Sequence, residues 1–118
     1  MTAMTTAHDL YRRWIDELWS GRPVAAELVA EDFVGHWPDR EIRGPAELQA
    51  VIDETHRMLD GLTFTIEVGP LVDGDLVAGR WTGQGRTAEG VATFSGNDIL
   101  RVADGRFAEY WNAAASDL

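Results

Sequence analysis

The most informative absences in this 118-residue chain are cysteine, lysine and any long apolar run. Without cysteine there is no disulfide framework, no thiolate nucleophile and no zinc–thiolate site. No apolar segment approaches the about 20 residues that a bilayer-spanning helix needs. The first residues also lack the basic and apolar regions of a secretory signal. We therefore expect a cytoplasmic protein that makes no use of a membrane.

Basic residues are also few in this chain. Ten basic residues, all arginine, stand against twenty carboxylates, and the formal net charge is −10. Phosphate backbones are bound by basic surfaces, so nucleic acid is excluded as a partner. The exclusive use of arginine, with abundant alanine, glycine and valine, indicates a GC-rich bacterial genome. No histidine–carboxylate spacing suits a metal, and no glycine stretch resembles a phosphate loop, so neither metal nor cofactor is expected.

The length of the chain predicts a single domain over residues 1–118. Helical patterns occupy its first half. Apolar residues recur every four positions in a first helix, which a threonine at position 5 or 6 caps and Gly21 ends. Pro23 opens a short second helix to about Val29. A third begins at Gly44-Pro45 and ends at Gly61.

Alternating patterns follow, preceded by one short strand at Phe33–Pro38. From Leu62 onward, apolar and polar residues alternate in successive segments, and Asp104-Gly105 predicts a tight hairpin between the last two. The order predicts an α+β fold, with three N-terminal helices packed in the concave face of a strongly curved antiparallel sheet. Such a cone-shaped α+β barrel leaves an apolar cavity at its open end.

Asp98 is the residue that the pattern singles out. Strand alternation places it on the same face as Phe94 and Leu100, although burying an unpaired carboxylate is costly. If Tyr110 and Asn112 of the next strand share that face, the three form the polar floor of a pocket. The alternative is that Asp98 caps a loop or pairs with an arginine at the sheet edge.

Several segments together resemble the SnoaL-like polyketide cyclase branch of the nuclear transport factor 2-like superfamily. They are W-S-G after the first helix, D-F-V-G-H-W-P, the Gly-Pro start of the third helix, and D-I-L-R-V-A-D-G-R-F-A-E-Y-W near the end. In the similar ketosteroid isomerases, the position of Asp98 holds the aspartic acid of the oxyanion hole, a case that the field uses for a neutral buried carboxyl. Their tyrosine and base positions correspond to Trp14 and Trp37 here. The cyclases' acid/base aspartate corresponds to Asn112, and an amide cannot exchange a proton near neutral pH.

Two functions remain open. In the first, the protein is a cofactor-independent cyclase, isomerase or hydrolase acting on a hydrophobic oxygenated molecule such as a polyketide or terpenoid. Asp98 would be the acid/base and His36 a proton shuttle. The predicted substrate-binding residues are Asn112 and Tyr110, which hold oxygens, and the wall residues Trp14, Trp37, Trp81 and Phe94. In the second, the protein only binds such a molecule or is a structural dimer.

A homodimer is expected in either case. The outer sheet face would expose apolar surface, and exposed patches of that kind commonly mark interfaces. A two-fold contact through the sheet is the simplest closed arrangement, and the fold commonly pairs in this way. The residues assigned to this face are Thr93, Ser95, Ile99, Phe107 and Trp111.

Overall fold

Helices precede strands in the computed structural model, which describes residues 6–116. Helix α1 (Ala7–Arg13) runs directly into a π-helical turn, η1 (Trp14–Leu18). The Thr6 side chain accepts a hydrogen bond from the Asp9 N–H at 3.1 Å, which completes a capping box at the start. Gly21, at φ 106°, ends the segment as predicted.

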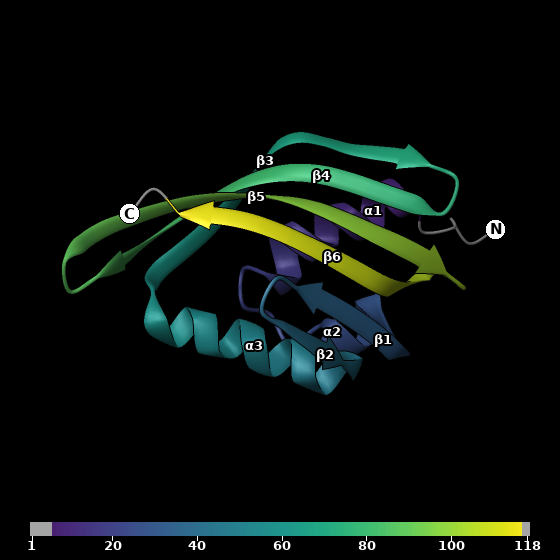
Figure 1. Ribbon diagram of the computed structural model, residues 1–118, viewed down its shortest axis with the longest axis horizontal. Coiled ribbons are helices and arrows are strands. Elements are labelled where there is room, and N and C mark those ends of the chain that lie inside the picture. The colour runs from purple at the N-terminus through teal and green to yellow at the C-terminus, as the bar shows by residue number, and fades with distance from the viewer. Residues whose placement is uncertain (1–5, 117–118) are drawn as a thin grey trace.

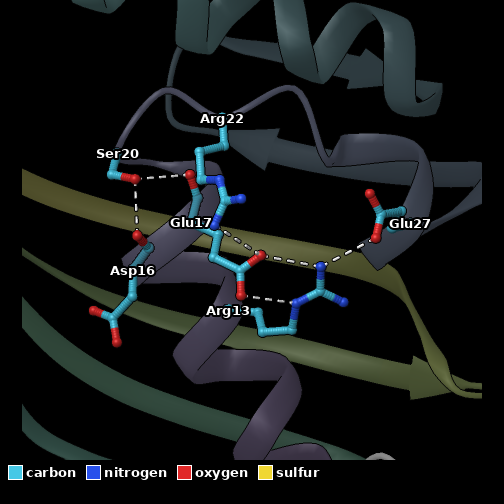
Figure 2. Close-up of polar contacts among 6 residues, drawn as sticks. All are labelled: Arg13, Asp16, Glu17, Ser20, Arg22 and Glu27. Atoms are coloured by element: carbon cyan, nitrogen blue, oxygen red, sulfur yellow. Dashed lines mark hydrogen bonds and ion pairs between the residues drawn. The ribbon is translucent and has the colours of Figure 1, made fainter.

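A polar network holds the end of this first helical segment against the next one (Figure 2). The Arg13 guanidinium binds Glu17 at 3.0 Å and reaches Glu27 of helix α2 (Ala25–Leu28) at 3.1 Å. The Ser20 hydroxyl donates to the main-chain carbonyls of residues 16 and 17. Exposed ion pairs contribute little free energy. The network links the end of α1 to α2 across the turn that follows η1.

The third helix, α3 (Gly44–Met58), begins at the predicted Gly-Pro pair. Leu48, Val51 and Ile52 are its buried residues and pack toward the sheet. No helix among residues 6–116 is long and apolar enough to cross a membrane.

Six strands form one open sheet in the order β2-β1-β6-β5-β4-β3 (Figure 1). Their bounds are β1 Val29–Trp37, β2 Arg40–Arg43, β3 Asp60–Asp73, β4 Leu76–Thr87, β5 Gly90–Ala103 and β6 Arg106–Ser116. All neighbours are antiparallel except β1 and β6, which are parallel. Strand β2 lies between the predicted strand Phe33–Pro38 and the third helix and was not itself predicted. The predicted α+β architecture is confirmed, but the sheet does not close into a barrel.

Turn chemistry explains the last hairpin. Asp104 and Gly105 have φ angles of 53° and 80°. Two successive residues with positive φ form a type I′ turn, whose twist matches that of the flanking strands. The hairpin predicted from Asp104-Gly105 is therefore confirmed.

A β-bulge in β6 changes which aromatic side chains face the helices. Arg101 pairs with Glu109 but the next residue of β5, Val102, pairs with Phe107, so Ala108 is the extra residue. Because a bulge interrupts the alternation, Phe107 and Tyr110 both point inward. Phe107 is fully buried, so its predicted place on the outer face is wrong.

Candidate functional site

A cavity of about 220 Å³ lies between the helices and the inner face of the sheet. Every sheet strand and the helical segments η1 and α3 contribute to it. Its lining is mostly apolar and aromatic, with a small polar group at one wall. The lining residues are Ile15, Trp19, Trp37, Arg40, Val51, Thr55, Phe64, Trp81, Phe94, Asp98, Tyr110, Asn112 and Ala114.

Asp98 is the buried polar residue of this wall, with 1% of its surface exposed. The Tyr11 hydroxyl donates to one carboxyl oxygen at 3.0 Å and the Tyr110 hydroxyl donates to the other at 2.7 Å. Tyr11 reaches the carboxyl because Gly79, opposite Asp98 on β4, has no side chain. A Cβ at position 79 would lie 2.5 Å from the Tyr11 ring.

Asn112 completes the polar group from the other side. It lies directly opposite Asp98 on β6, and its amide donates to the Tyr110 hydroxyl at 2.7 Å. The Tyr110 oxygen therefore accepts one hydrogen bond while its hydrogen is given to Asp98. Asn112 retains a second N–H and its carbonyl oxygen, and the Asp98 oxygens retain lone pairs. These free groups lie at the cavity wall.

Burial dominates the electrostatics of the site. It raises the pKa of Asp98, because the charged form loses its hydration, and hydrogen-bond donors offset part of the rise. Those donors are Tyr110, Trp81, Tyr11 and Trp14, in decreasing order. Burial, and then the nearby Asp98 charge, also raises the pKa of both tyrosines, so their hydroxyls stay protonated and donate.

The Trp14 indole N–H acts on Asp98 only at longer range. Trp14 Nε1 makes no hydrogen bond of ordinary geometry and is the one buried side-chain polar atom without a partner in the described part of the chain. Among residues 6–116 no ion pair involves Asp98, and the hydrogen bonds of ordinary geometry to its carboxyl come from Tyr11 and Tyr110. The alternative interpretation of Asp98 as the partner of an arginine is therefore corrected.

The structure brings most of the predicted site residues together. Asp98, Tyr110 and Asn112 share the polar wall, while Trp37, Trp81 and Phe94 line the cavity. Trp81 lies over Gly96, where a Cβ would overlap its indole ring.

Trp14 is not a wall residue. Its side chain is fully buried behind Tyr110, with the ring centroids 4.9 Å apart, and it also contacts Phe33 and Phe107. Its inclusion among the substrate-binding residues is therefore corrected. Trp19, just after η1, lines the cavity instead.

His36 lies on the outer face of the sheet and not beside Asp98. Its Nε2 is 2.7 Å from Glu109, and its ring stacks on Trp111. Strand alternation is the reason, since Trp37 points into the cavity and the preceding residue must then point away. The prediction that His36 shares the chemistry of Asp98 is corrected accordingly.

Sequence reasoning also missed residues that helix periodicity and the resemblance did not single out. They are Tyr11, which lies in the first helix, Phe64, which lies in the alternating segment from Leu62, and Arg40, which lies just before the third helix. The spacing of Tyr11 one turn before Trp14 was the available signal, because residues three apart share a helix face.

Among the described residues, no group of three histidine or carboxylate side chains is arranged to hold a metal ion. The polar wall instead presents a carboxyl, a phenol and an amide, which can donate and accept hydrogen bonds.

The cone-shaped α+β fold, with a polar group at the wall of an apolar cavity, places this protein in the class of small domains that enclose a ligand-sized cavity. The family model of the SnoaL-like domain matches residues 11–110. The chain therefore belongs to the SnoaL-like domain family. None of the curated proteins matches it significantly in sequence.

Solved structures of similar fold include proteins described in the same terms as this family. A Bacillus cereus protein described as a candidate polyketide cyclase is 26% identical over 90% of this chain and 72% of its own, with a TM-score of 0.80. IdmH from Streptomyces antibioticus, also described as a candidate polyketide cyclase, is 25% identical over 92% of this chain and 90% of its own, with a TM-score of 0.75. TsrD from Streptomyces laurentii is 21% identical over 97% and 91%, with a TM-score of 0.80, a likeness of fold.

Proposed function

We propose that this protein is a cofactor-independent enzyme that moves a proton next to a carbonyl group of a small, largely apolar molecule. The observation that carries the proposal is the Asp98 carboxyl, buried at the wall of an apolar cavity with tyrosine partners and with no cation paired to it among residues 6–116. Proton abstraction beside a carbonyl is the step that cyclisation and isomerisation share. The likeness to candidate polyketide cyclases points the same way.

Each polar group has a distinct role in this proposal. The Asp98 carboxylate accepts the proton, for which its raised pKa suits it, since a base works best when its pKa approaches the working pH. The second N–H of Asn112 donates to the carbonyl oxygen as negative charge develops there. Tyr110 does not touch the carbonyl in this scheme. It holds Asp98 in place, because its hydrogen is already committed.

The cavity volume limits the substrate. Cavities for drug-sized ligands measure about 300–1,000 Å³, while an apolar cavity of about 150 Å³ holds a benzene molecule. At about 220 Å³ this cavity takes one or two rings. A larger substrate would extend through the opening.

Hydrogen–deuterium exchange tests the proposal without knowledge of the natural substrate. α-Tetralone, a bicyclic ketone, is incubated with the protein in D₂O, and loss of the proton signals beside the carbonyl is followed by NMR. The wild-type protein should accelerate exchange, and Asp98→Asn should lower that acceleration by about 10²–10⁴-fold. Asp73→Asn, an exposed carboxyl at the end of β3, is the matched control.

Two outcomes would contradict the proposal in different ways. If α-tetralone quenches tryptophan fluorescence but exchanges no faster than in buffer, the protein is a binding protein, which is the second function that the sequence left open. If exchange is accelerated equally by wild type and Asp98→Asn, another group is the base.

A further inference from the structure

Arg40 is a charged residue in an otherwise apolar part of the cavity lining. It begins strand β2 and lies directly across the hairpin from Trp37, whose ring also lines the cavity. Arg40 is exposed, whereas Asp98 at the polar wall is buried. The lining thus combines a solvent-exposed guanidinium with a buried carboxyl.

The guanidinium of Arg40 has no partner among residues 6–116, since it takes part in none of the side-chain hydrogen bonds or ion pairs found there. Arg43, on the same strand, differs in this respect because its guanidinium is paired with Glu41. Asp39 and Glu41 flank Arg40 in the sequence, but neither forms an ion pair with it, and the Glu41 carboxyl is bound by His36 and Arg43 instead. The five N–H donors of Arg40 remain available to a ligand.

The positive charge of Arg40 indicates which chemical group of a ligand would bind at this part of the lining. The protein as a whole repels anions, so an anionic ligand needs a local cation to enter. A guanidinium matches the planar geometry of a carboxylate and binds it through two parallel hydrogen bonds. An apolar body would fill the aromatic part of the cavity, and the charged end would stay at the solvent-exposed opening.

We propose that Arg40 binds a carboxylate of the ligand at the cavity opening, so that the protein takes a ring-containing carboxylic acid with its ring directed toward Asp98. This inference rests on the proposed function and specifies its substrate class. It makes Arg40 a specificity-determining residue that selects acids over neutral molecules of the same shape.

A pair of matched ligands tests the inference. 2-Naphthoate and 2-naphthamide have the same ring and nearly the same shape but differ in charge. Binding is measured by titration of the ¹⁵N-labelled protein, with the indole N–H signals of Trp19, Trp37 and Trp81 as reporters for the cavity. Wild type should bind the acid about five- to tenfold more tightly than the amide, and added salt should reduce that preference.

Three variants assign the preference to one side chain. Arg40→Gln should weaken binding of the acid more than binding of the amide and so abolish the preference. Arg40→Lys should restore part of the preference because the charge returns without the planar fork. Arg43→Gln is the matched control and should keep the full preference. Because Arg40 is exposed and unpaired, its variants should melt at the wild-type temperature.

The possible failures are distinguishable. If wild type shows no preference for the acid, or if Arg40→Gln keeps it, the inference about Arg40 is wrong while amide binding in the cavity still supports the proposed function. If neither ligand shifts an indole signal, the proposed function fails, and the inference fails with it.

Discussion

Replacement of Asp98 by asparagine should change the pH dependence of stability in a direction that burial dictates. The pKa of Asp98 is raised in the folded protein, chiefly by desolvation, above the about 3.9 expected in the unfolded chain. The folded state therefore binds the proton more tightly. The contribution of Asp98 to stability is most favourable below the unfolded-state pKa and falls as pH rises through the folded-state pKa.

Two opposing free-energy costs decide whether wild type or Asp98→Asn is more stable. Each pH unit that separates the two pKa values costs the wild type about 1.4 kcal/mol once pH exceeds both. The amide avoids that cost but accepts only one tyrosine hydrogen well. Its Nδ2 must then donate to the other tyrosine, which leaves one buried O–H unpaired at a cost of about 1–3 kcal/mol. A separation of one pH unit already offsets the lower end of that cost.

Urea unfolding followed by tryptophan fluorescence measures the effect between about pH 4 and pH 8. The free energy of unfolding of Asp98→Asn minus that of wild type should rise with pH, because the other titrating groups cancel in the difference. Asp73→Asn, at an exposed position, is measured in parallel as the control for the loss of one carboxylate. A difference for Asp98→Asn that is constant, or that falls as pH rises, would refute the reasoning and mark Asp98 as a stably ionised structural residue.

The remaining predictions concern the residues around Asp98 and the outer sheet face. Tyr11→Phe removes a donor to the carboxyl and should cost about 1–2 kcal/mol in urea unfolding while moving the titration of Asp98 to higher pH; unchanged stability would count against the hydrogen bond. Gly96→Ala should lower stability by about 1–3 kcal/mol, since its methyl group meets the Trp81 ring, and calorimetry showing an unchanged melting temperature would contradict that packing. The homodimer stays a prediction. Wild type should sediment as a dimer at micromolar concentration and Trp111→Glu as a monomer, and a monomeric wild type would remove the proposed interface.

The outer face retains part of the apolar surface on which the dimer prediction depends. Ile99 and Trp111 are cross-strand partners and are 47% and 38% exposed. Two apolar side chains that adjoin each other in this way fit a two-fold contact better than scattered ones. With Phe107 removed to the core, the patch is smaller than the sequence indicated.

Local chemistry alone determined much of this protein. A type I′ turn needs two residues that tolerate positive φ, and Asp104-Gly105 is such a pair. The hairpin could therefore be predicted from these two residues alone. Alternation along β5 placed Asp98 on the apolar face because successive strand residues must point in opposite directions. The order of helical and alternating segments then gave the α+β architecture, since each apolar face must be buried against another.

Only the tertiary structure decided what surrounds Asp98. Its partner Tyr11 lies 87 residues earlier in the chain and reaches it because Gly79 leaves space. The bulge after Phe107 restored Tyr110 to the inner face, and no local signal fixes where one strand gains an extra residue on its neighbour. Alternation permits two opposite assignments of His36 and Trp37, and packing against the core selected the tryptophan. Sequence periodicity fixes which residues share a face, while long-range contacts fix which face becomes the cavity.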